Sequence, residues 1–186
     1  RHDLLGPHYR EAYPETWDGG IDPALAYCGP FRLEDALPGG DGMTVGEALR
    51  SPTRTYAPVI AALLREHRGQ VRGLVHCSGG GQTKCLRFGN KVHFIKDNLF
   101  APPPVFAAIQ KASGTSDAEM HQVYNMGHRM EVFCPPEAAD VLINRIRDFG
   151  IEAQVVGRTE PSTHPEGRNH LTLTTQAGAT VTYAQP

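Results

Sequence analysis

Apolar residues recur every three to four positions in several stretches of the chain, which is typical of helices that bury one face. Prolines begin the first, second and fourth of these stretches, a capping box over residues 116–119 begins the third, and Gly69 and Gly150 end the first and the fourth. The pattern predicts helices over residues 58–68, 104–111, 116–124 and 136–149, and one Thr-capped helical turn over residues 44–49. The expected buried positions of the second helix are Val105, Phe106, Ile109 and Ala112, and the residues that mark the fourth are Ala138, Val141, Leu142, Arg145 and Phe149.

Shorter apolar or alternating runs predict β-strands between the helices. They cover residues 71–77, 129–134 and 151–157, and a terminal hairpin over residues 171–175 and 180–183 turns at Gly178. A polar stretch over residues 158–168 precedes the hairpin. Because strands and helices interleave, we expect an α/β (α+β) fold, with packed helices around one mixed β-sheet. We expect a single domain over residues 1–186, with a Gly/Pro-rich lead-in (1–50), a core (51–157) and the terminal hairpin region (158–186).

Composition and charge exclude several classes of protein. The 186 residues are 40% hydrophobic and 20% charged, as in ordinary globular proteins. A net charge of -2 argues against a generic nucleic-acid binder, which needs an excess of Lys and Arg. No apolar run approaches the roughly 18 residues that cross a bilayer, so we expect no membrane association. The chain begins without Met or a signal peptide, which suggests a fragment of a cytoplasmic protein with four reduced cysteines.

The sharpest chemical motif runs from Gly73 to Gly81 and reads as a strand that enters a glycine loop. Ser78, Gly79, Gly80 and Gly81 expose backbone N–H groups that suit a phosphate or carboxylate. At the end of the strand, His76 is placed to donate a hydrogen bond or to shuttle a proton. The alternative is a tight turn beside a core histidine, and the residues alone weigh the two about equally. The spacing fits neither a Walker loop nor a nucleophile elbow.

Other candidate groups are weaker. His76, Cys77, Cys85 and His93 have no ligand-pair spacing, so we expect no metal bound by this chain. Cys77 and His76 are neighbours on a strand and should point to opposite faces, which favours a structural Cys77. Arg54, before the first predicted helix, either binds an anion or pairs with a carboxylate at the helix start. In Asn125-Met126-Gly127, a turn in which Gly127 takes a positive φ is favoured over a chemical role.

Taken together, these segments resemble the C-terminal domain of aminoimidazole ribonucleotide (AIR) synthase, also called phosphoribosylformylglycinamidine cyclo-ligase. Residues 52–56 match the family's Pro-Thr-Arg-x-Tyr stretch, and residues 73–81 match its Gly-Leu-x-His-x-x-Gly-Gly-Gly strand and loop. Glu119-Met120, residues 124–127 and Met130 follow in the same order and spacing. The resemblance covers roughly residues 50–157.

The chain also departs from the family pattern. After the glycines the family usually has Leu and then Asn-x-Pro-Arg, whereas this chain reads Gln-Thr-Lys-Cys-Leu-Arg and only Arg87 matches. The usual Gly-x-Gly-Met is replaced by residues 127–130, which read Gly-His-Arg-Met. These departures are typical of a divergent, synthase-related branch, and they bear on the substrate more than on the fold.

The resemblance implies an enzyme that uses ATP and Mg²⁺ to phosphorylate an amide oxygen, after which an internal amine closes an imidazole ring of purine biosynthesis. It implies that Ser78, Gly79, Gly80 and Gly81 hold a phosphate. His76 would be the catalytic residue, and Arg54, Arg87 and Asn125 would bind a phosphorylated small-molecule substrate. Most of the ATP and Mg²⁺ site would lie in an N-terminal domain, through which family members form homodimers. This chain alone would then be inactive.

Two alternatives stay open. One is another member of the same superfamily, such as a selenophosphate synthetase or a thiamine-phosphate kinase-like protein. The other is an anion-binding domain that has kept the fold and lost the chemistry, for which the altered loop after Gly81 is the best support.

Overall fold

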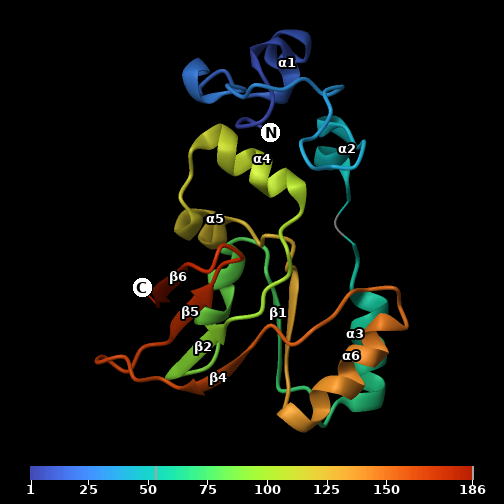
Figure 1. Ribbon diagram of the computed structural model, residues 1–186, viewed down its shortest axis with the longest axis vertical. Coiled ribbons are helices and arrows are strands. Elements are labelled where there is room, and N and C mark those ends of the chain that lie inside the picture. The colour runs from blue at the N-terminus through green and yellow to red at the C-terminus, as the bar shows by residue number, and fades with distance from the viewer. Residues whose placement is uncertain (53, 186) are drawn as a thin grey trace. The chain divides into compact units, whose positions relative to one another are not determined.

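The computed structural model describes residues 1–52 and 54–185, which form two compact units (Figure 1). Within this range, the first unit contains residues 1–52 and 102–116, and the second contains residues 54–101 and 117–185. The expectation of a single domain over residues 1–186 stays a prediction.

The first unit is built from short helices around a small core. Its elements are α1 (Pro7–Ala12), η1 (Pro14–Thr16), η2 (Pro23–Leu25), α2 (Val45–Arg50) and α4 (Pro104–Ser113). The predicted helical turn is confirmed: the Thr44 hydroxyl accepts from the Glu47 N–H (3.1 Å), and the Glu47 carboxylate accepts from the Thr44 N–H (2.8 Å). This capping box satisfies N–H groups that the first turn of α2 leaves unpaired. In α4, Ile109 is buried as expected, but the expected Ala112 is exposed.

The second unit carries the sheets and the remaining helices (Figure 1). Its helices are α3 (Ala57–His67), η3 (Gly81–Arg87), α5 (Asp117–Val123), η4 (Pro136–Ala138) and α6 (Ala139–Arg147). Its strands are β1 (Gly73–His76), β2 (Val92–Lys96), β3 (Met130–Phe133), β4 (Gly157–Pro161), β5 (His170–Thr174) and β6 (Thr180–Ala184). Mixed sheets with packed helices confirm the predicted fold class.

The described strands form two sheets, so the expectation of one sheet is wrong. β1 and β3 pair antiparallel, with Val75 opposite Glu131 and His76 opposite Met130. The other sheet has the order β4-β2-β5-β6, in which β2 and β5 are parallel and the other pairs antiparallel. The hairpin of β5 and β6 turns at Gly178, as predicted, with a φ of 82°.

Two apolar clusters hold the second unit together. One lies against the four-stranded sheet and contains Cys85, Leu86, Phe94, Leu99, Leu171 and Leu173. The other joins α3 to α6, which lie side by side in Figure 1, through Val59, Leu63, Ala138 and Leu142. Of the apolar residues along the fourth predicted helix, Ala138 and Leu142 are buried, whereas Val141 and Phe149 are 42% and 39% exposed. α6 ends at Arg147, before Phe149.

Two strands of the four-stranded sheet, β2 and β4, differ from the prediction made from the sequence. The sequence pattern predicts no strand at β2, which like β5 is paired on both edges, and where a lysine occupies a buried position. It predicts a strand over residues 151–157, whereas the structure has irregular chain up to residue 156 and then β4. β4 is a polar edge strand, defined by its ladder to β2 rather than by alternating hydrophobicity. Within the described residues, no helix is long and apolar enough to cross a membrane.

Candidate functional site

The glycine loop, residues 78–81, joins β1 to η3 in a tight turn. The Gly81 N–H donates to the Ser78 carbonyl (3.0 Å), and the Thr83 N–H donates to the Gly80 carbonyl (2.9 Å). The Gly81 N–H is therefore engaged inside the turn, and the N–H groups of Gly79 and Gly80 remain the candidates for contact with an anion.

The three glycines of the loop occupy different environments. Gly80 has a φ of 100°, which side-chain-bearing residues rarely adopt. Gly81 has a φ of 46°, and a Cβ there would lie 2.4 Å from the Tyr124 carbonyl oxygen. Gly79 needs no such explanation, because its φ is outside the left-handed region and a Cβ there would meet nothing within 4 Å. The fold thus accounts for Gly80 and Gly81, but not for Gly79.

His76 is the last residue of β1, and its side chain is exposed. The next residue, Cys77, is 1% exposed, so the two neighbours face opposite sides as the strand pattern predicted. The ring of Tyr56 lies beside His76, with ring centroids 6.3 Å apart and an edge-on angle of 62°. Tyr56 is the last residue of the Pro-Thr-Arg-x-Tyr stretch, and no role was predicted for it from the sequence. The structure places it next to His76, which belongs to the strand that enters the glycine loop.

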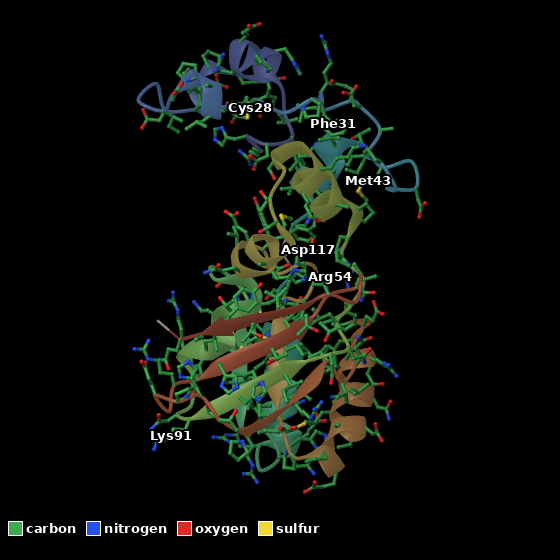
Figure 2. All side chains as sticks on the ribbon, turned by 60° about the vertical axis from the view of Figure 1, so that its left-hand side comes forward. Cys28, Phe31, Met43, Arg54, Lys91 and Asp117 are labelled. Atoms are coloured by element: carbon green, nitrogen blue, oxygen red, sulfur yellow. The ribbon has the colours of Figure 1, made fainter. Side chains whose placement is uncertain are left out.

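Two of the other three predicted binding residues, Arg54 and Asn125, make hydrogen bonds within the fold. Arg54, labelled in Figure 2, is exposed. Its guanidinium donates to the Gly150 carbonyl (3.4 Å), and it forms no ion pair with a carboxylate among the described residues. Asn125 accepts the Gly127 N–H on its side-chain oxygen (2.9 Å), in a turn where Gly127 has the predicted positive φ (91°). Arg87 is exposed at the last position of η3. Substrate binding by these three residues stays a prediction.

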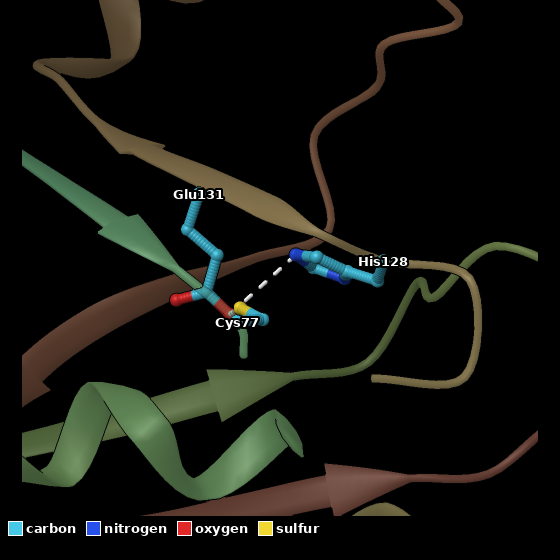
Figure 3. A group of neighbouring side chains, drawn as sticks. All are labelled: Cys77, His128 and Glu131. Atoms are coloured by element: carbon cyan, nitrogen blue, oxygen red, sulfur yellow. Dashed lines mark hydrogen bonds and ion pairs between the residues drawn. The ribbon is translucent and has the colours of Figure 1, made fainter. Parts of the chain in front are cut away.

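Behind the loop lies a buried polar network that the sequence analysis missed. The Lys96 ammonium donates to the Glu131 carboxylate and to the backbone and side-chain oxygens of Gln82 (2.7 and 3.2 Å). The Cys77 thiol donates to the same Glu131 oxygen, Oε1 (3.3 Å), and His128 Nε2 lies 3.5 Å from it. Figure 3 shows Glu131 extending from β3 toward Cys77, with the His128 ring facing them. Lys96 and Glu131 are 4% and 6% exposed, so the pair is shielded from water.

Burial and the Glu131 charge set the protonation states of this network. Burial alone would lower the pKa of Lys96, but the adjacent carboxylate outweighs that effect and raises it, so the lysine stays charged. Burial raises the pKa of the Cys77 thiol well above its usual range, and Glu131 adds to the effect. Burial lowers the pKa of His128 to about 4, so its ring is neutral at pH 7. The network therefore contains one ion pair and two neutral partners.

Among the residues that the structure describes, Cys77, His128 and Glu131 form a group that could hold a metal ion, since their ligand atoms lie within 4.8 Å of one another. Only Cys77 belongs to the group considered from the sequence. A sulfur, an imidazole and one carboxylate do not suit Mg²⁺, which prefers oxygen ligands and bound water. The Lys96 ammonium already neutralises Glu131 on the oxygen that the other two side chains face. We therefore interpret the group as an internal ion-pair site.

A pair of histidines lies on the four-stranded sheet, away from the loop in sequence. The rings of His93 and His170 stack with centroids 3.9 Å apart, on the paired strands β2 and β5. His170 Nδ1 is 2.8 Å from the Ser162 hydroxyl, and His93 Nε2 is 2.9 Å from the Thr172 hydroxyl. Both rings are thus held by hydroxyl groups.

Comparison with known proteins agrees with the resemblance noted from the sequence. Residues 31–168 match the family described as AIR synthase related protein, C-terminal domain. Phosphoribosylformylglycinamidine cyclo-ligase of Methanocaldococcus jannaschii is 36% identical over 126 residues, which are 68% of this chain and 36% of the relative. The enzyme of Methanopyrus kandleri is 34% identical (70% and 36%), and the chloroplastic enzyme of Arabidopsis thaliana is 33% identical (68% and 33%).

A solved structure shares the fold. The hydrogenase maturation protein HypE of E. coli superposes with a TM-score of 0.50 at 18% identity, over 72% of this chain and 40% of that one. The matches span only about a third of the length of the cyclo-ligases. The family match covers most of this chain, and it contains both the glycine loop and the buried network. The chain therefore belongs to the family of AIR synthase related proteins, and its residues 31–168 correspond to the C-terminal domain of that family.

Proposed function

We propose that this chain is the C-terminal part of an ATP-dependent phosphoribosylformylglycinamidine cyclo-ligase of purine biosynthesis. The observation that carries the proposal is the exposed His76 at the end of β1, two residues before a glycine loop in which Gly79 is open to approach. Family membership gives the reaction class, since the relatives are cyclo-ligases by name.

The proposed reaction makes an amide oxygen into a leaving group. The γ-phosphoryl group of ATP is transferred to the formyl-amide oxygen of the substrate, which gives ADP. An amine nitrogen of the same substrate then attacks the amide carbon, so that a C–N bond forms and the C–O bond breaks. The bonding electrons of that C–O bond leave with inorganic phosphate. The protein must hold the phosphate and manage one proton.

The loop and His76 supply these two needs in the proposal. The N–H groups of Gly79 and Gly80 donate to phosphate oxygens, since the Gly81 N–H is engaged in the turn. His76 donates to the amide oxygen or accepts the proton that the attacking amine loses. The ring of Tyr56 limits where the His76 imidazole can swing. Arg54 and Arg87 are the candidates for balancing the phosphate charge.

ATP, Mg²⁺, a phosphorylated substrate and a homodimer belong to the proposed whole enzyme. The described residues offer no oxygen-rich group for Mg²⁺, because the Cys77, His128 and Glu131 group is buried and contains sulfur and imidazole. No step through the metal is therefore assigned to this chain. Inactivity of the 186-residue chain alone and a cytoplasmic location are parts of the same proposal.

The test is ring formation by the complete gene product with ATP, Mg²⁺ and formylglycinamidine ribonucleotide. We expect activity in the wild type and a loss of about 100-fold or more in His76→Ala, the range for a general acid or base. Gly79→Ala should also lose activity, because its methyl group would stand where the phosphate approaches. Gly69→Ala is the matched control, since a Cβ there also meets nothing within 4 Å.

Two results would contradict the proposal. If the folded, ATP-binding wild type forms no ring product, the substrate is wrong, and another phosphotransfer reaction of the superfamily becomes the better assignment. If Gly79→Ala is as active as Gly69→Ala, the phosphate does not approach the loop at Gly79.

A further inference from the structure

Both ends of the glycine loop are attached to one buried ion pair. Cys77, directly before the loop, donates from its thiol to Glu131 (3.3 Å). Gln82, directly after it, accepts the Lys96 ammonium on its backbone oxygen (2.7 Å) and side-chain oxygen (3.2 Å). Lys96 lies on β2 and Glu131 on β3, so the pair also connects the two sheets at the base of the loop.

The attachment is specific on the lysine side. An ammonium group has three N–H donors, and Lys96 directs them to three acceptors, one on Glu131 and two on Gln82. Gln82 is completely buried, and its side-chain amide also donates to the Asn125 carbonyl (2.6 Å). The first turn of η3 is therefore fixed to β2 on one side and to the turn before β3 on the other.

Stability alone gives no reason for an ion pair at this place. Removing two charges from water is costly, and replacing a buried pair by apolar side chains of similar size is often neutral or stabilising. Apolar side chains have no directed bonds, however, and would leave the Gln82 carbonyl and the Cys77 thiol without these partners. What the pair adds is a defined position for both ends of the loop.

We propose that Cys77, Gln82, Lys96 and Glu131, here called the loop clamp, are positioning residues that hold the glycine loop and His76 in their active geometry. They act through the loop and do not touch substrate. Their effect on catalysis rests on the proposed function, whereas their effect on the loop does not.

The structural arm measures amide hydrogen exchange by NMR in the 186-residue chain. The variant is Lys96→Met with Glu131→Leu, which removes both charges together and avoids a buried unpaired one. We expect a melting temperature near that of the wild type but faster exchange at Gly81 and Thr83, whose N–H groups donate within the loop. Exchange in β5 should not change. Unchanged exchange at Gly81 and Thr83 would overturn the proposal.

A stability control separates positioning from general loosening. Leu142→Ala removes a buried side chain from the cluster between α3 and α6, which contains no residue of the loop clamp. Each protein is measured the same number of degrees below its own melting temperature. Under these conditions the exchange rates at Gly81 and Thr83 should be the same in Leu142→Ala as in the wild type. If Leu142→Ala accelerates both as much as the double variant does, the loop follows global stability and the proposal fails. If the double variant melts at a lower temperature than the wild type, the comparison with Leu142→Ala still distinguishes a local effect on the loop from a loss of global stability.

The catalytic arm uses the complete gene product. The double variant should lose about 100-fold in kcat/KM, the order expected for a misplacement of about 1 Å. An inactive wild type would sink the proposed function and leave the exchange result standing. An active double variant with a faster-exchanging loop would refute the catalytic part alone.

Discussion

Substituting the glycines of the loop one at a time should separate those required by the fold from the one left to function. Gly81→Ala places a methyl group 2.4 Å from the Tyr124 carbonyl oxygen and 2.7 Å from that of His121, at a φ of 46°. These oxygens belong to buried or half-buried backbone around the end of α5, so they cannot move aside freely. Gly79→Ala meets neither obstacle.

Backbone strain and steric overlap determine the expected difference in unfolding free energy between Gly81→Ala and Gly79→Ala. An alanine in the left-handed region costs about 1–2 kcal/mol, and the overlap adds to that, so we expect Gly81→Ala to lose more than about 2 kcal/mol of unfolding free energy. Gly79→Ala should gain about 0.4–1 kcal/mol, because the unfolded chain becomes less flexible. With a slope of about 2 kcal/mol per M urea, the midpoints of the two variants should differ by at least about 1 M.

Urea unfolding followed by far-ultraviolet circular dichroism measures these midpoints. Gly178→Ala is the control for backbone strain, since that residue has a φ of 82° but no atom near a Cβ. Its midpoint should fall between those of Gly79→Ala and Gly81→Ala. Coincident midpoints for Gly79→Ala and Gly81→Ala would refute the assignment of structural roles within the loop.

Three further outcomes are expected. Burial, and to a smaller extent the neighbouring histidines, lower the pKa of His170 below 6.5. Below that pH the unfolded chain therefore binds more protons than the folded chain, and the free energy of unfolding falls as the pH drops. His170→Gln should weaken this pH dependence, measured as urea midpoints at several pH values, and equal dependence in the variant and the wild type would contradict the prediction. The exposed Cys28 should react with iodoacetamide far faster than Cys77, whose pKa burial raises, and peptide mass spectrometry showing equal labelling would refute this. Leu173→Ala, at a completely buried position of the sheet cluster, should cost about 2–5 kcal/mol in urea unfolding, and a loss below about 1 kcal/mol would contradict the packing.

The sequence predicted the elements whose pattern is local. The Thr-capped α2, helix α3 and the hairpin of β5 and β6 are each marked by start or stop signals in neighbouring residues, such as Thr44, Gly69 and Gly178. The strand predicted over residues 151–157 failed because apolar residues there pack as irregular chain, with Ile151 and Val156 against different clusters. β4 follows instead, in a polar segment that no hydrophobic pattern marks, because its position depends on pairing with a strand about 60 residues earlier.

In the candidate site, too, residues marked by a local pattern could be predicted from the sequence, and residues that depend on distant partners could not. His76 and the glycine loop are contiguous in the chain, so a strand followed by glycines was enough to find them. Lys96 and Glu131 are charged residues in short strands, and a sequence pattern treats such residues as solvent-facing. Their burial depends on partners 14, 35 and 54 positions away. The one available signal was the spacing of Lys96, which lies two residues after the apolar Phe94 and therefore on the same face of the strand.

A residue type that suits a ligand carries functional information only where the fold does not already require it. Gly80 and Gly81 are needed by the turn, and the Asn125 side chain by the turn before β3, so their identities say little about phosphate. Gly79 and His76 are different, because a Cβ at Gly79 would meet nothing within 4 Å and His76 is exposed. The identities of these two residues are therefore the ones that bear on the proposed function. If the complete gene product kept its activity in both Gly79→Ala and His76→Ala, the loop would have a structural role as a turn and no role in catalysis.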